Sequence, residues 1–336
     1  MFKKYVVTLS LIAILVAMLT GCAAPAAPTA APVAPAAEFK MALLSPGSVN
    51  DQGWNSIAYG ALKRVESELG AKTSYVELQQ DPASYEKAFR DYASQGYQMI
   101  LGHGNEFQDA AITVAKDFPN VQFFISSSRV SETNVTGLNT ASDQMMYLMG
   151  IISAKMCKSG GFIGGMEIPP VSEALVGYIN GAKSVNPDYK IFSTYTGNFS
   201  DAAAAKEAAL SMISQGADCL VPDADVAGQG VYQAVIEKGP SIWTFGLFTT
   251  GSAPGQVLAN YLSDYGQGIV NIAKEVKAGT YKGGKNVEFG VGDPEVMKFI
   301  YDETAKPAVP QDVRDAVTAA MKDIAAGKIN TLAPVK

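Results

Sequence analysis

Two kinds of apolar pattern alternate along most of the chain. Short apolar runs, such as residues 39–45, are separated by longer segments in which apolar residues recur every three or four positions, as in residues 54–69. The first pattern predicts buried strands, and the second predicts helices with one apolar face. In the first half we expect strands at 39–45, 72–78, 98–101 and 121–126 and helices at 54–69, 83–95 and 107–116.

The alternation pauses near residues 134–139 and then starts again. Strands that alternate with helices predict parallel sheets covered on both faces, and a series that runs twice predicts two similar α/β lobes. In the second half we expect helices at 143–157, 172–185, 201–215, 228–238, 265–278 and 310–326 and strands at 161–164, 190–195, 219–222, 241–246 and 256–261.

Ligands of such sheets bind beside the carboxyl ends of the strands. We therefore expect the binding residues in the loops that follow the predicted strands, which narrows the search to a small part of the chain. Those loops are residues 45–55, 102–107, 126–129, 166–172, 195–201, 222–230 and 246–254.

The N-terminal residues have the pattern of a lipoprotein signal. Lys3 and Lys4 precede an apolar run at 5–19, and the sequence LTGC then ends at Cys22. This is the order of charged, apolar and small-residue regions in a secretory signal peptide. The run is shorter than the roughly 20 residues of a membrane-spanning helix, which disfavours a retained anchor. We expect a signal peptide at 1–21 and a lipid on the thiol of Cys22.

Residues 23–37 are almost only alanine and proline, with Thr29 and Val33. Such a segment has no periodic apolar face to bury, and its prolines stiffen it. We expect residues 22–37 to form a semi-rigid tether that holds a folded domain off the membrane. The predicted location is therefore extracytoplasmic, anchored to the cell membrane through the lipid on Cys22.

Charge and composition exclude several kinds of partner and site. The chain has 26 Lys and Arg against 32 Asp and Glu, and removal of residues 1–21 leaves 24 − 32 = −8. An acidic chain with scattered charges argues against a nucleic-acid partner. His103 is the only histidine, and no cluster of histidine and cysteine has the spacing of a metal site. We expect neither a metal nor a cofactor.

Two cysteines, Cys157 and Cys219, remain once Cys22 is assigned to the lipid. Unpaired cysteines pack as small apolar residues, so we expect two buried thiols. A disulfide between them is permitted outside the cytoplasm and is the alternative.

The sequence favours a binding protein over an enzyme. A nucleophile triad needs a histidine base, and His103 is the single candidate. The serines at 126–128 are candidate nucleophiles that no feature marks as activated. A metal-dependent nucleoside hydrolase would need an aspartate cluster, and Asp223 with Asp225 offers only two carboxylates. We expect His103 to contact a ligand.

Four short motifs in order resemble one known family. The sequence NDQGWN at 50–55 follows the first strand, and the later motifs are VNPD at 185–188, TGNFSD at 196–201 and QGAD at 215–218. Together with the LTGC motif, this set resembles the basic membrane protein family. Its members are lipoproteins similar to the purine nucleoside receptor of ABC importers. The resemblance spans about residues 39–332.

The resemblance implies the type I periplasmic-binding-protein fold, an α/β fold with two Rossmann-like lobes whose parallel sheets are joined by three crossing strands. It places residues 38–138 with about 247–285 in lobe 1, and 139–246 with about 286–336 in lobe 2. The ligand is then enclosed between the lobes. The implied partners are a small-molecule ligand and an ABC permease and ATPase complex, with the membrane contacted through the lipid.

The resemblance also implies how a ligand is held. In purine-binding members, aromatic side chains from the two lobes sandwich the base, and the matching positions here are Trp54 and Phe199. Stacking on aromatic faces suits a planar heterocycle, and core packing is the alternative for each ring. For a polar residue the alternative is a helix cap or a loop hydrogen bond. The polar candidates are Ser45, Asn50, Asp51, His103, Asn105, Asp223 and Asp225.

The sequence departs from the nucleoside-binding members at three places. Those members have an Asp at the end of the first strand, where this chain has Ser45. They have another Asp where this chain reads LFTTG at 247–251, and a Lys where it reads YLS at 261–263. In the family these groups contact the ribose and the base edge. The implied ligand is therefore a purine base or nucleoside, with a free base such as adenine fitting the departures.

Two other functions remain open on the sequence. One is a binding protein for a sugar or a furanosyl signal, because sugars also stack on aromatic rings but need many polar partners. The other is a sensor lipoprotein that presents its ligand to a receptor and not to a permease. The polar partners available to a sugar are Tyr195, Asp223, Asp225 and Asn260.

Overall fold

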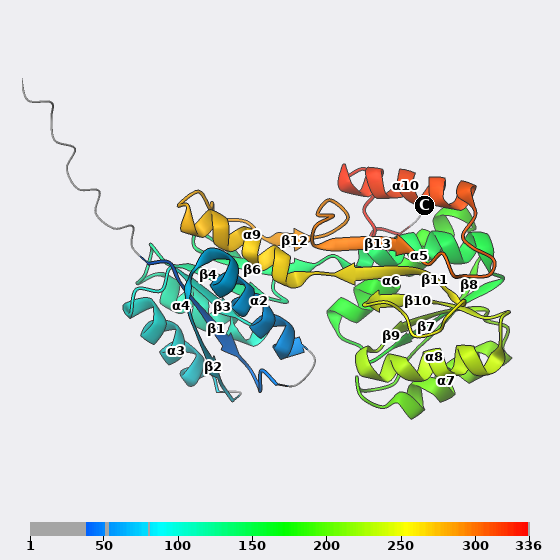
Figure 1. Cartoon of the computed structure of the whole chain (residues 1–336), viewed down its shortest axis with the longest axis horizontal. Coiled ribbons are helices and arrows are strands. Elements are labelled where there is room, and N and C mark those ends of the chain that lie inside the picture. The colour runs from blue at the N-terminus through cyan, green and yellow to red at the C-terminus, as the bar shows by residue number, and fades with distance from the viewer. Residues whose placement is uncertain (1–37, 51–53, 80, 335–336) are drawn as a thin grey trace, which may run out of the picture. The chain divides into compact units, whose positions relative to one another are not determined.

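The computed structural model describes residues 38–50, 54–79 and 81–334 (Figure 1). Residues Phe39–Lys336 form one compact unit. The predicted signal peptide, Cys22, the Ala/Pro tether and Asp51 lie outside the described residues. Within the described part of the chain, no helix is both long enough and apolar enough to cross a bilayer.

The first sheet is parallel except for one short strand. Its order is β12-β6-β4-β3-β1-β2, and β5 pairs antiparallel with β6. Alternate residues of β1 point to opposite faces, so Leu44 packs towards α3 and α4, while Leu43 packs towards α2 and α9. The strands are β1 (Lys40–Ser45), β2 (Lys72–Glu77), β3 (Met99–Gly102), β4 (Gln122–Ser126), β5 (Ser131–Glu132), β6 (Val135–Thr140) and β12 (Val287–Phe289). The helices are α2 (Trp54–Leu69), α3 (Pro82–Ser94), η1 (Asn105–Phe107), α4 (Gln108–Ala115) and α9 (Tyr265–Lys277).

The second sheet has the order β13-β11-β10-β9-β7-β8, and only β13 is antiparallel to its neighbour. Helices α7 and α8 cover one face, and α5 and α6 cover the other (Figure 1). The strands are β7 (Ser159–Gly164), β8 (Lys190–Tyr195), β9 (Cys219–Asp223), β10 (Trp243–Phe248), β11 (Val257–Ser263) and β13 (Met297–Tyr301). The helices are α5 (Ser142–Met156), α6 (Pro169–Val185), α7 (Ala202–Ser214), η2 (Asp225–Gly228), α8 (Gln229–Lys238) and α10 (Gln311–Ala325). The predicted pair of α/β lobes with parallel sheets is therefore confirmed.

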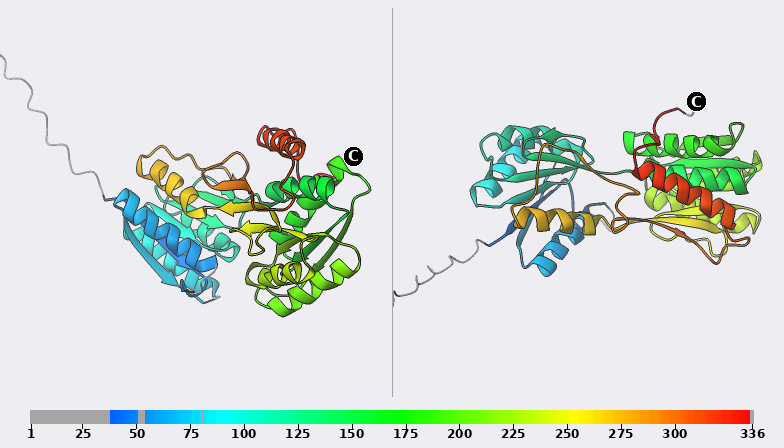
Figure 2. Two further views of the ribbon diagram at one scale, coloured as in Figure 1. Left: turned by 45° about the vertical axis from the view of Figure 1, so that its right-hand side comes forward. Right: turned by 90° about the horizontal axis from the view of Figure 1, so that it is seen from above.

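The chain passes between the two sheets three times. It leaves the first sheet after β6 and enters α5, returns from β11 through α9 to β12, and crosses again from β12 to β13 (Figure 2). The outgoing crossings start at the carboxyl ends of β6 and β11. The carboxyl ends of both parallel sheets therefore lie on the side where the chain crosses.

Two strands pair in a different sheet from the one expected from the predicted lobe boundaries. β11 falls in the range assigned to lobe 1 and pairs with β10 in the second sheet. β12 falls in the range assigned to lobe 2 and pairs with β6 in the first sheet. Each strand adjoins a crossing, where apolar periodicity carries no information about which sheet a strand will join.

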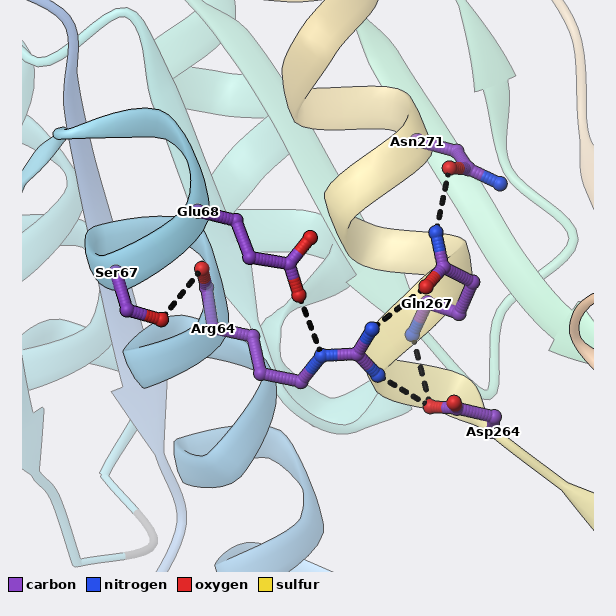
Figure 3. Close-up of polar contacts among 6 residues, drawn as sticks. All are labelled: Arg64, Ser67, Glu68, Asp264, Gln267 and Asn271. Atoms are coloured by element: carbon purple, nitrogen blue, oxygen red, sulfur yellow. Dashed lines mark hydrogen bonds and ion pairs between the residues drawn. The ribbon is translucent and has the colours of Figure 1, made fainter.

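Arg64 fixes the start of α9 against α2 (Figure 3). Its guanidinium donates to the Asp264 carboxylate at 2.6 Å and to the Gln267 side-chain oxygen at 2.6 Å, and it also pairs with Glu68 at 3.0 Å. Asp264 in turn caps α9 by accepting from the backbone N–H of Gln267. An exposed ion pair stabilises a fold only slightly, so the main effect of these bonds is to set the direction in which the chain leaves β11.

The prediction of two buried thiols is wrong. Cys157 and Cys219 form a disulfide with a Cα–Cα distance of 6.0 Å across a sequence separation of 62 residues. The bond joins the residue after α5 to the first residue of β9, two elements that meet in the same core. The sequence could not show this pairing, because it depends on how α5 packs across the second sheet.

Candidate functional site

The predicted site residues lie at or just after the carboxyl ends of the strands. Ser45 ends β1, Asp223 ends β9, and His103 follows β3. Phe199 lies in the loop between β8 and α7, and Trp54 is the first residue of α2. This placement agrees with the general rule for open α/β sheets.

Trp54 and His103 form a stacked pair in the first lobe. Their ring centroids are 3.7 Å apart with an interplanar angle of 28°. His103 is 2% exposed, whereas Trp54 is 42% exposed. One side of the indole thus rests on a buried ring, while much of the residue stays accessible. Trp54 does not lie in the core, although the apolar stripe of α2 begins with it.

The hydrogen bonds of His103 hold it in one orientation. Its Nε2 lies 3.0 Å from the backbone oxygen of Trp54, and its Nδ1 lies 2.9 Å from Oγ of Ser126. A carbonyl oxygen can only accept, so Nε2 carries a proton, and in the neutral imidazole Nδ1 accepts from the serine hydroxyl. His103 therefore positions Trp54 in two ways: it hydrogen-bonds the Trp54 backbone oxygen, and it stacks on the Trp54 indole.

The other candidates of the first lobe have simpler surroundings. Ser45 is buried, and its hydroxyl donates to the Gly47 carbonyl at 2.9 Å and lies 3.1 Å from Oδ1 of Asn55. These bonds tie the first loop to the end of β1. Asn50 and Asn105 are both exposed, the first in a turn and the second at the start of η1. Ser45 thus shapes the loop, while the two asparagines stay accessible.

Phe199 is held by two loops of the second lobe that are bonded to each other. The backbone N–H of Thr196 donates to Gly164 at 2.9 Å, and that of Gly197 donates to Gly165 at 2.7 Å. The Phe199 ring then lies over Gly165, where an added Cβ would be 2.2 Å from the ring. A glycine is therefore needed at position 165 for the half-buried ring to lie where it does.

Asp223 is a buried carboxylate with a raised pKa. The residue is 8% exposed. Among the residues that the structure describes, no hydrogen bond or ion pair involves its side chain. Burial, and then the charge of the exposed Asp225, raise the pKa of Asp223 to about 7. An unpaired buried carboxylate is costly, so a ligand that brings an N–H donor or a positive charge would be favoured here.

The sequence did not single out two aromatic residues of the second sheet, Phe248 and Tyr261, as site candidates. Phe248 ends β10, and Tyr261 lies within β11; their ring centroids are 4.8 Å apart. The Tyr261 hydroxyl lies 3.1 Å from Oγ of Ser142. The one available signal for Phe248 was its place in the predicted loop at 246–254.

The described contacts do not bring Trp54 and Phe199 together, since each packs against residues of its own lobe. The two lobes are instead joined by a bidentate ion pair. Arg129, which follows β4, donates to both carboxylate oxygens of Glu173 on α6 at 3.0 and 2.7 Å.

Among the residues that the structure describes, no group of three or more His, Cys, Asp or Glu is placed to hold a metal ion.

The sequence profile of the family described as ABC transporter substrate-binding protein PnrA-like matches residues 39–330. The chain belongs to this family. The resemblance found in the loop motifs is thereby confirmed. PnrA-like proteins bind small molecules and serve ABC transporters, whose substrate-binding components act outside the cytoplasm, and no catalytic activity is indicated for the family.

Individual relatives agree with this assignment of the PnrA-like chain. It is 31% identical to an ABC transporter nucleoside-binding protein, BmpA, of Lactococcus lactis, over 97% of this chain and 98% of the relative. It is 26% identical to a purine-binding protein of Brucella abortus, over 89% of this chain and 85% of the relative. Among solved structures, a solute-binding protein of an ABC transporter system from Conexibacter woesei is 26% identical with a TM-score of 0.67, covering 87% of this chain and 98% of the other.

Proposed function

We propose that this PnrA-like protein captures a purine base or nucleoside outside the cytoplasm and delivers it to the permease of an ABC importer. The observation that carries the proposal is Trp54, an accessible indole held against buried His103 at the carboxyl end of the first sheet. In the proposed complex, the two lobes close on the ligand, and Phe199 stacks on the opposite face of its ring. A planar heterocycle gains most from two such surfaces.

Asp223 supports a nitrogen heterocycle in particular. A purine carries N–H groups that can donate to a carboxylate, and a hydrogen bond to a charged group is roughly twice as strong as one between neutral groups. The buried side chain of Asp223 has no donor among the described residues, so such a ligand would satisfy it. Relatives described as nucleoside-binding and purine-binding agree with this ligand class.

The proposal excludes catalysis. Ser126 and His103 are the residue types of a nucleophile and its base, and they are hydrogen-bonded. The other nitrogen of His103, however, donates to the Trp54 carbonyl, an arrangement that orients the indole. We assign the pair to positioning of the aromatic surface.

A screen of melting temperature tests the ligand class. We expect purine bases or nucleosides to raise the melting temperature more than ribose, glucose or amino acids do, because a ligand at 100 times its dissociation constant stabilises the folded state by about 2.7 kcal/mol. Guanidine and imidazole serve as controls for small N–H donors without the bicyclic ring. A screen in which only sugars shift the transition would overturn the purine assignment and favour a sugar-binding protein.

We further propose that Cys22 carries a lipid that anchors the protein to the membrane. The variant Cys22→Ser should stay unprocessed and should incorporate no labelled fatty acid, because only a thiol is alkylated at that position. Growth with a radiolabelled fatty acid, followed by immunoprecipitation, checks this, and Cys157→Ser serves as a control that should still be labelled. Labelling of Cys22→Ser at the wild-type level would refute the anchor.

A further inference from the structure

Arg129 lies between carboxylates that belong to different lobes. It follows β4 in the first lobe, and its guanidinium donates to both carboxylate oxygens of Glu173 on α6 of the second lobe, at 3.0 and 2.7 Å. The nitrogen that makes the shorter bond, Nη2, also lies 3.7 Å from Oε1 of Glu288. Glu288 belongs to β12 and therefore to the first sheet. One cation thus has one anionic partner on its own lobe and another on the opposite lobe.

The backbone on both sides of Arg129 is fixed to the first lobe. The Ser128 carbonyl accepts from the side chain of Asn139 on β6 at 2.5 Å. The Val130 carbonyl accepts from the backbone N–H of Gly137, also on β6, at 2.7 Å. An added Cβ at Gly137 would be 2.1 Å from the Ser128 oxygen, so a glycine is needed for the loop to lie this close to the strand. The base of Arg129 therefore moves with the first sheet, while its half-exposed side chain can turn.

Glu173 is fixed to the second lobe by the tight packing of α6 on α5. At Gly177 of α6, an added Cβ would be 2.2 Å from the backbone oxygen of Asp143 in the first turn of α5. Helices packed this closely move together, because there is no free space between them. α5 is also the helix that the chain enters after it leaves the first sheet. A rotation of the lobes about the crossings therefore moves Glu173 relative to Arg129 and leaves Glu288 beside it.

We propose that the Arg129–Glu173 ion pair is a latch between the lobes that sets the ligand affinity without touching the ligand. The inference rests on the proposed capture of a ligand between the lobes. In the structure the pair is formed, and Trp54 is 42% exposed. Enclosing a ligand covers this indole, so the lobes rotate, the guanidinium leaves Glu173, and Glu288 becomes its partner. The latch opposes closure, and the exchange keeps the cation paired in the closed arrangement.

The two carboxylates are therefore expected to act in opposite directions. The apparent affinity of a ligand is its intrinsic affinity scaled by the fraction of molecules in the binding-competent arrangement. Glu173→Gln removes the latch and should tighten binding of the best purine about two- to fivefold, the range of an exposed ion pair. Glu288→Gln removes the partner of the closed arrangement and should weaken binding about two- to fivefold. Glu303→Gln is the matched control, because it breaks a bidentate pair with Arg314 inside the second lobe, at 2.7 and 2.9 Å, and should leave the affinity unchanged.

Isothermal titration of the detergent-solubilised full-length protein measures these affinities, and a distance between the lobes tests the latch without any ligand. Spin-labelled unnatural amino acids replace the exposed residues Gln79 and Ala203, which leaves the native cysteines unlabelled. These residues lie just after β2 and β8, the strands at the ends of the two sheets opposite the crossings, so closure should shorten the distance between them. In double electron–electron resonance of the ligand-free protein, Glu173→Gln should increase the short-distance population at least twofold, and Glu303→Gln should not change it.

The possible failures are distinct. Unchanged affinity and an unchanged distance distribution in Glu173→Gln, with the purine still bound, would overturn the latch and leave the proposed function standing. Weaker binding in both Glu173→Gln and Glu288→Gln would also overturn it, because two structural defects explain that result. A wild-type protein that binds no purine would overturn the proposed function, and the ligand-free distances would still decide the latch.

Discussion

Raising the pH from 5 to 8 is expected to lower the free energy of unfolding of the ligand-free protein by about 2–3 kcal/mol through Asp223 alone. The pKa of this carboxyl is about 7 in the folded protein, against 3.8 for an ordinary aspartate. A raised pKa means that the folded state binds the proton more tightly than the unfolded state does. The stabilisation by that proton is complete below pH 3.8 and is lost as the pH rises through 7.

Urea denaturation at several pH values measures the effect. Asp223→Asn cannot ionise, so its stability should fall less than that of the wild type between pH 5 and 8, and it should be the more stable protein at pH 8. Asp188→Asn, in an exposed turn before β8, is the control and should follow the wild-type profile. Parallel profiles for the wild type and Asp223→Asn would mean that the carboxylate is not held unpaired in a dry environment.

The sequence predicted the regular elements of the two lobes well because their apolar patterns are strong. β8 spans the predicted residues 190–195, and α2 spans the predicted 54–69. The strands that went unpredicted, β5, β6, β12 and β13, lie near the crossings or at sheet edges. β12 has only three residues, and β6 carries Thr136 and Gly137 in a buried stretch, so neither shows a strand pattern.

The sequence indicated which loops carry the candidate site but not how the side chains in those loops contact one another. The loops predicted from the carboxyl ends of the strands are where the structure places Trp54, Phe199 and Asp223. The stacking of Trp54 on His103 joins residues 49 positions apart and depends on how β1 pairs with β3. Phe248 is 44% exposed and has a φ of 61°. Bulky residues rarely adopt this conformation, so the residue type gave no indication of it.

Truncating Trp54 to alanine is expected to weaken purine binding by about 5- to 150-fold, from the 1–3 kcal/mol that stacking of a base on an aromatic residue contributes in nucleic-acid complexes. Trp54→Phe should keep most of the affinity, because an aromatic face remains. The melting temperature of ligand-free Trp54→Ala should change little, since the residue is 42% exposed.

The alternative for Trp54 gives the opposite pair of results. If Trp54 were a core residue, its truncation would lower the free energy of unfolding by about 3–5 kcal/mol. The affinity for the purine would then stay nearly unchanged. Calorimetry and thermal melting of the same Trp54→Ala preparation therefore separate the two roles. Ile57→Ala, at an exposed apolar residue one turn further along α2, is a control that should alter neither quantity strongly.

A fluorescence titration tests the central claim, stacking of the ligand on Trp54, most directly. Trp54 and Trp243 are the two tryptophans of the chain. The fluorescence of each can therefore be removed in turn by substitution with phenylalanine. We expect the purine that binds most tightly to quench the emission of the wild type and of Trp243→Phe, with the midpoint given by calorimetry. Trp54→Phe should bind the same purine with no change in emission. Undiminished quenching in Trp54→Phe, or calorimetric binding to the wild type without quenching, would contradict the account.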